Sequence, residues 1–177
     1  MPNIIVTSGG FNTINNYVSQ DNIELFKKSL NFDESSKSLT SLERTANGID
    51  YNRLSVLIAV LEKKVGLNLG NQDVYLNVVS GLKINEPAID LGIIAATVSS
   101  FKNIPIDTEI VVLGEVGLTG EVRSINLIEK RIKEAEKLGF KKCIIPESNK
   151  KLLKENFKLD IIGVKNIIDA MKYLGLK

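Results

Sequence analysis

The chain has 177 residues, 44% hydrophobic and 25% charged, which is enough for one good core and typical of a globular protein. Its 23 Lys and Arg against 21 Asp and Glu leave a net charge of +2, too small for a strong overall attraction to nucleic acid. Histidine is absent and Cys143 is the single cysteine, which excludes an internal disulfide and leaves no plausible metal site. The start lacks a signal-peptide pattern and no apolar run could cross a bilayer, so we expect a cytoplasmic protein that needs no cofactor, metal or membrane.

Residues 1–41 differ from the rest and are expected to form an extension or a connector to another domain. Residues 3–7 favour a short strand, broken by the glycines at 9 and 10. Apolar spacing over residues 22–30 favours a short helix, and residues 33–38 form a polar linker. A separate binding element in this segment is the alternative.

From Tyr51 the pattern becomes helical, with apolar residues recurring at three and four positions until Gly66. Residues 73–79 alternate between apolar and polar, which predicts a half-buried strand. Pro87 suits the first turn of the next helix. That helix is apolar almost all round, so it should be central and buried.

The second half of the chain alternates strands and helices. Residues 110–113 predict a buried strand, and Gly117 and Gly120 bracket the turn of a hairpin. Asn126 is expected to cap a helix that ends at Gly139. These elements indicate an α/β protein with a mixed strand order.

The last third continues this pattern. Residues 142–145, which contain an apolar run with Cys143, predict a strand with a buried structural thiol. Ser148 should open a short basic helix, residues 161–164 form a strand, and Asn166 should cap the final helix.

Five ordered stretches carry a resemblance to a known family: residues 43–53, 59–64, 86–90, 114–123 and 126–131. The order and spacing of the last three resemble the proteolytic domain of Lon, a serine–lysine peptidase. The first four together are more similar to the Lon-like C-terminal domain of the RadA (Sms) family of bacterial DNA repair and recombination proteins. The resemblance covers residues 42–177. It implies a two-layer Lon-protease-like fold (ribosomal protein S5 domain 2-like) with a mixed sheet.

Both positions that would carry peptidase chemistry hold unsuitable residues. Ala88 stands where Lon has its serine nucleophile, and Arg131 stands where Lon has its lysine base. Alanine has no nucleophile and arginine stays protonated, so we expect a catalytically inert domain. The nearest hydroxyls in sequence are Ser80, expected to face solvent, and Ser99 and Ser100, which lie about three helical turns away from the Ala88 position.

The RadA resemblance implies a part in DNA repair and recombination without catalysis in this chain. The chain has neither the Cys-x-x-Cys zinc finger nor the phosphate-binding loop of that family, so ATP hydrolysis cannot reside in these residues. The resemblance implies a homo-oligomeric ring, a hexamer by family expectation, that contacts single-stranded or branched DNA during branch migration. A RadA-type ATPase domain would act in cis or in trans. The alternatives are a divergent Lon-type peptidase and a pure oligomerisation scaffold.

Two acidic residues at the start of the buried helix have two possible roles. Glu86 and Asp90 could bind a metal or pair with Arg131, or they could simply complement the helix dipole. The dipole role is the commoner one, and we favour it. An ion pair from either carboxylate to Arg131 is nevertheless expected, because the family fold brings these positions close.

The candidate DNA-binding residues are all basic. Arginine suits phosphate recognition, but intramolecular or intersubunit ion pairs are an equally good reading of the four arginines. Arg123 ranks first because it follows a hairpin turn and should be exposed. Lysines in the short helix should form a basic stripe, whereas the alternating charges of residues 129–137 indicate a solvated face with i,i+4 pairs. Aromatic residues are few, so base stacking is weakly supported. The candidates are Arg44, Arg53, Arg123, Lys150, Lys151 and Lys154.

Overall fold

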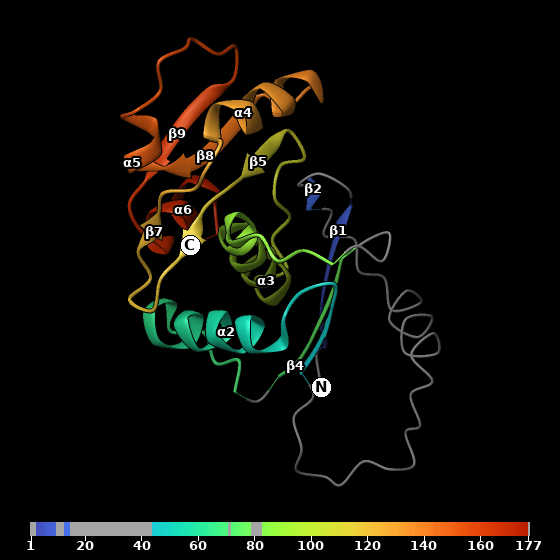
Figure 1. Cartoon of the computed structure of the whole chain (residues 1–177). Coiled ribbons are helices and arrows are strands. Elements are labelled where there is room, and N and C mark those ends of the chain that lie inside the picture. Colours follow the sequence, from blue (N-terminus) through green and yellow to red (C-terminus); the bar gives the residue numbers. More distant parts are fainter. Residues whose placement is uncertain (1–2, 10–12, 15–43, 71, 79–82, 177) are drawn as a thin grey trace, which may run out of the picture.

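The computed structural model describes residues 3–9, 13–14, 44–70, 72–78 and 83–176 (Figure 1). The helix expected at residues 22–30 and the linker at 33–38 lie outside the described residues. Helices alternate with parallel and antiparallel strands, which confirms the α/β class. No helix in the described part of the chain is long and apolar enough to cross a membrane.

The first sheet has the strand order β2-β1-β4-β3. Its strands are β1 (Asn3–Gly9), β2 (Thr13–Ile14), β3 (Arg44–Asn47) and β4 (Asp73–Val78). β1 and β3 both run parallel to β4, while β2 pairs antiparallel with β1. β1 therefore precedes the expected domain boundary at residue 42 and yet belongs to the same sheet as β3 and β4.

β4 was predicted to be half buried, and this prediction was wrong. Five of its six residues are buried, on both faces of the strand, and its two edges are paired with β1 and β3. The alternation of Val74, Leu76 and Val78 with Tyr75 and Asn77 marks one face as more apolar. It carries no information about the position of the strand within its sheet.

The second sheet is parallel, with the order β5-β8-β9. β5 (Ile110–Val112), β8 (Lys142–Pro146) and β9 (Asp160–Val164) confirm the three strands expected here. β6 (Glu115–Val116) and β7 (Val122–Arg123) pair antiparallel and confirm the hairpin. Cys143 in β8 is buried as expected, and burial raises the pKa of its thiol to about 12.

Two long helices follow; the second lies between the two sheets, and the first lies beside it (Figure 1). α2 (Tyr51–Val65) is capped by the side chain of Asp50 and ends at Gly66, whose φ of 75° is left-handed. α3 (Asp90–Lys102) follows the short 3₁₀ turn η3 (Pro87–Ile89). Its residues 90–99 are all buried, which confirms the central helix. Because α3 is packed on every side, the residues at its start, where Asp90 lies, are held in fixed positions.

The remaining helices cover the second sheet. α6 (Ile167–Tyr173) is capped by Asn166, whose side chain accepts a hydrogen bond from the Asp169 amide at 2.9 Å, as predicted. α4 (Ile128–Lys137) does not use Asn126 as its cap, because Leu127 takes that position with a left-handed φ of 58°. α5 (Glu147–Lys150) is a single turn, shorter than the basic helix expected from Ser148.

Candidate functional site

Ala88 is sealed inside the protein. It is 0% exposed and belongs to a buried cluster that includes Val111, Leu113 and Ile132. Its carbonyl accepts a hydrogen bond from the Gly114 amide at 2.8 Å, which ties η3 to the short connection between β5 and β6. A hydroxyl at this position would therefore have no direct access to solvent or to a substrate.

Arg131 pairs with Glu86. Its Nη2 lies 3.0 Å from Glu86 Oε2, and its Nε donates to the carbonyl of Asn126 at 3.0 Å. An ion pair of Arg131 with either Glu86 or Asp90 was expected, and Glu86 is the partner, because Asp90 pairs with Arg53 instead. The guanidinium is held by two acceptors, and 23% of the side chain is exposed.

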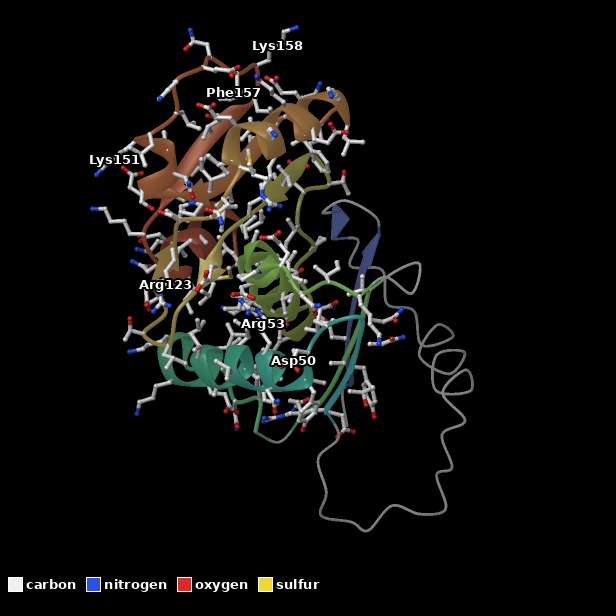
Figure 2. The ribbon with its side chains drawn as sticks, viewed as in Figure 1. Asp50, Arg53, Arg123, Lys151, Phe157 and Lys158 are labelled. Atoms are coloured by element: carbon white, nitrogen blue, oxygen red, sulfur yellow. The ribbon has the colours of Figure 1, made fainter. Side chains whose placement is uncertain are left out.

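Asp90 pairs with Arg53 from α2. Arg53 donates through Nε to Asp90 Oδ1 at 2.5 Å and through Nη2 to Oδ2, and the Val116 amide donates to Oδ2 at 3.1 Å. Burial raises the pKa of Asp90 although the hydrogen bonds from Arg53 oppose this, whereas the bond to Asp90 raises the pKa of Arg53. The pair joins α2, α3 and β6, and it occupies Nε and Nη2 of Arg53, whose side chain is 33% exposed (Figure 2).

Within the described residues, no group of three metal-binding side chains occurs. Each member of the acidic pair at the start of α3 instead holds one arginine: Glu86 binds Arg131 and Asp90 binds Arg53. Ser99 is buried and donates its hydroxyl to the Ile104 carbonyl. Ser80 lies outside the described residues.

Arg123 is exposed, as predicted, but it is also paired. Its Nε donates to Glu121 Oε1 at 2.9 Å, and its Nη1 lies 3.5 Å from Glu115 Oε1. A hydrogen bond from the Thr119 hydroxyl, assisted by Arg123, lowers the pKa of Glu121 to about 2. A Cβ at Gly117 would lie 1.9 Å from Glu121 Oε1, so glycine is required for this arrangement. Arg123 is therefore surrounded by two carboxylates.

The other candidates do not gather at one place. Arg44 lies on β3 and is partly buried. Lys150 donates its ammonium to the Ile161 carbonyl at 2.7 Å, and Lys151 Nζ lies 3.8 Å from Glu147 Oε1. The expected stripe of Lys150, Lys151 and Lys154 is wrong, because α5 ends before Lys151 and no helix holds the three side chains on one face. Figure 2 shows Lys151 and Arg123 pointing outward from separate places.

The acidic residues of α4 anchor the neighbouring loop. Glu129 accepts a hydrogen bond from the Lys154 amide at 2.8 Å, Glu136 accepts one from the Lys158 amide, and Lys133 pairs with Glu155 at 2.6 Å. The charged face of α4 is solvated at Lys130, Lys133, Glu134 and Lys137, as expected, but contacts to the loop and the i,i+3 pair of Lys137 with Glu134 take the place of the expected i,i+4 pairs. The loop of residues 151–159 is fastened by its backbone, so the Lys154 and Lys158 side chains are presented outward (Figure 2 labels Lys158).

Charge is separated along the chain, and the sequence interpretation missed this. Residues 126–177 contain 13 Lys and Arg against 7 Asp and Glu, a net charge of +6, while residues 1–125 contain 10 against 14, a net charge of −4. The positive segment comprises α4, β8, α5, β9 and α6, which gather together in Figure 1 in orange to red. We call residues 126–177, which are 52 of the 177 residues, the basic half. A running count of charge along the chain would have revealed it from the sequence alone.

A family model for ChlI, described as subunit ChlI of Mg-chelatase, matches residues 43–149, and the chain belongs to this family. The chain is also related to proteins named DNA repair protein RadA. It is 52% identical over 129 residues to RadA of Bacillus subtilis (strain 168), which is 73% of this chain and 28% of that protein. It is 45% identical over 130 residues to RadA of Streptococcus pneumoniae (strain ATCC BAA-255 / R6), covering 73% of this chain and 31% of the relative. The chain thus spans only about a quarter to a third of the length of these relatives.

Proposed function

We propose that this chain is a catalytically inert, Lon-like domain of a RadA-type DNA repair protein and that its basic half contacts DNA. The kinship with RadA supports a role in DNA repair. The observation that carries the DNA contact is the separation of charge, with +6 on the basic half and −4 on the rest of the chain. Such a separation concentrates positive charge on one part of the chain, whereas the net charge of +2 describes only the whole.

The inert character rests on two local arrangements. Ala88 has no nucleophile and is fully buried, and Arg131 is a permanent cation already paired with Glu86. Buried alanine and paired arginine stabilise the fold at the two positions where the Lon family places its catalytic pair. The domain therefore contributes binding and not hydrolysis.

Self-association would multiply a modest DNA contact. A ring, a hexamer by family expectation, would repeat the basic half around one axis and present it to a single or branched strand. Exposed apolar side chains such as Leu118, Ile168 and Tyr173 are available for contacts between copies. The ATP-driven step of branch migration belongs to a RadA-type ATPase domain in cis or in trans.

The DNA contact is tested with a matched pair of double variants. Lys154→Ala/Lys158→Ala removes two charges from the basic half, and Lys63→Ala/Lys83→Ala removes two exposed charges elsewhere. Binding of a fluorescent single strand is followed from about 50 to 200 mM salt, where three phosphate contacts would lower the affinity roughly twentyfold. We expect only the first variant to weaken binding and flatten the salt dependence. Equal effects would refute the assignment to the basic half.

Absence of DNA binding at about 50 mM salt, where phosphate contacts are strongest, would leave the scaffold function in its place. Light scattering of the same samples measures assembly independently of DNA binding. A chain that assembles but does not bind DNA is a scaffold. Labelling by a serine-reactive fluorophosphonate would instead support the alternative of a divergent Lon-type peptidase.

A further inference from the structure

A groove of about 430 Å³ lies beside α4 in the basic half. Its floor contains Val111 and Ala135, both buried, and the partly buried ring of Phe140. Leu127 and Leu138 form its edges and are 62% and 55% exposed. The volume is within the range of small-ligand sites, and the lining combines an aromatic ring with aliphatic side chains.

The backbone at the edge of the groove is strained. Leu127 has a left-handed φ of 58°, a conformation that is unfavourable for a leucine, and it makes no side-chain cap for α4. The strained turn holds a large apolar side chain in solvent at the mouth of the groove. Strain of this kind is retained where the surroundings impose it, and it occurs preferentially at binding sites.

The charged groups of the groove favour an anionic ligand. Lys130, Arg131 and Glu134 line it; Arg131 is paired with Glu86 at 3.0 Å and Glu134 with Lys137 at 3.2 Å, which leaves Lys130 as the excess positive charge at the groove. The planar guanidinium of Arg131 is fixed by Glu86 and by the carbonyl of Asn126. A fixed guanidinium and an aromatic ring are the two kinds of surface on which nucleobases stack.

We propose that this groove takes an unpaired nucleobase of a single DNA strand while the basic side chains contact the adjoining phosphates. This inference rests on the proposed function and deepens it, since it names the form of DNA that the basic half prefers. A base inside a duplex is stacked on both faces and cannot enter. The chain therefore prefers single-stranded DNA to a duplex of equal charge.

The decisive comparison uses two strands with the same phosphates. One is an oligothymidine, and the other has abasic sugars in place of its central nucleotides. Wild-type protein binds the intact strand about tenfold more tightly, the lower range of what one stacked base contributes. Phe140→Leu, which keeps the groove apolar but removes the ring, brings this ratio close to one and leaves the affinity for the abasic strand unchanged.

Leu127→Gly separates binding from stability. Glycine adopts the left-handed conformation without strain, so this variant keeps or raises the Tm while it removes one edge of the groove. It lowers the ratio of intact to abasic affinity. Leu152→Ala is the matched control, because Leu152 is 71% exposed in the same half but does not line the groove, and it leaves the ratio unchanged.

Three results overturn the proposal. If wild-type protein binds intact and abasic strands equally, the contact is to phosphates alone and the proposed function survives without the base site. If neither strand binds, the base site and the proposed DNA contact are both refuted. If Leu127→Gly dissociates an oligomer and leaves the ratio unchanged, the groove is an interface between copies of the chain.

Discussion

Removal of Arg53 should destabilise the protein far more than the loss of a surface charge. Asp90 is buried, with a side chain 1% exposed, and it receives two hydrogen bonds from Arg53 and one from the Val116 amide. Arg53→Met keeps most of the packing volume but leaves the carboxylate without its counter-charge. Breaking a buried ion pair on one side costs about 3–5 kcal/mol. Since 33% of the Arg53 side chain is exposed, we expect the lower value, about 3 kcal/mol.

Thermal and urea unfolding measure this loss. A decrease of about 3 kcal/mol corresponds to a Tm roughly 6–12 °C lower in a domain of this size. The control is Lys137→Met, which breaks the pair with Glu134 three residues away. The Lys137 side chain is 74% exposed and the Glu134 side chain 51%. Exposed pairs contribute about 0–1 kcal/mol, so this variant should stay close to wild type.

The pH dependence of the variant provides a second check. Burial raises the pKa of Asp90 in the folded state, and without Arg53 nothing but the Val116 amide opposes it. Between the raised pKa and the ordinary carboxyl pKa, the folded variant binds a proton that the unfolded chain does not, so its stability rises as the pH falls through the raised pKa toward the ordinary value. The difference from wild type should shrink over this range. A loss below about 1 kcal/mol, or a difference independent of pH, would refute the role of the pair.

Three further outcomes follow from other contacts. Ala88→Ser should gain no hydrolytic activity, and fluorophosphonate labelling would contradict this. The same variant should lose about 1–3 kcal/mol of unfolding free energy, because it buries a hydroxyl where the native side chain makes no hydrogen bond. Gly117→Ala should displace the Glu121 carboxylate and return the pKa of Glu121, about 2 in the native hairpin, toward its ordinary value, which carboxyl NMR titration measures. In the native protein the contribution of Glu121 is present above its unfolded pKa and is lost as the pH falls through about 2, so an unchanged titration in the variant would be evidence against the network. Arg53→Met should leave DNA affinity unchanged below its Tm, and a specific loss would show that Arg53 reaches the DNA.

Local sequence patterns predicted most elements correctly. The helical spacing from Tyr51 and the glycine stop at Gly66 correspond to α2, and Asn166 caps α6. These features depend on residues within one or two turns of each other, so a short window contains the necessary information. The cap of α4 was missed because the strained Leu127 contradicts the preference for asparagine at a helix start.

Tertiary structure decided how deeply β4 is buried and which side chains meet. Alternation showed that β4 is a strand, but only the folded structure shows that side chains on both of its faces are buried and that both of its edges are paired. The short basic helix was overpredicted, since α5 is one turn long. Lysine spacing indicates which residues would share a helical face and not whether the helix persists.

The sequence by itself determined the α/β class, the buried central helix, the lack of a nucleophile at Ala88 and the excess of positive charge after residue 125. These are properties of residue type and of near neighbours. The partners of the arginines were decided only in the folded chain, where Arg53 meets Asp90 across 37 positions and Arg131 meets Glu86. An ion pair depends on the separation of two groups in space, and chain folding sets that separation between segments whose local patterns are independent of each other.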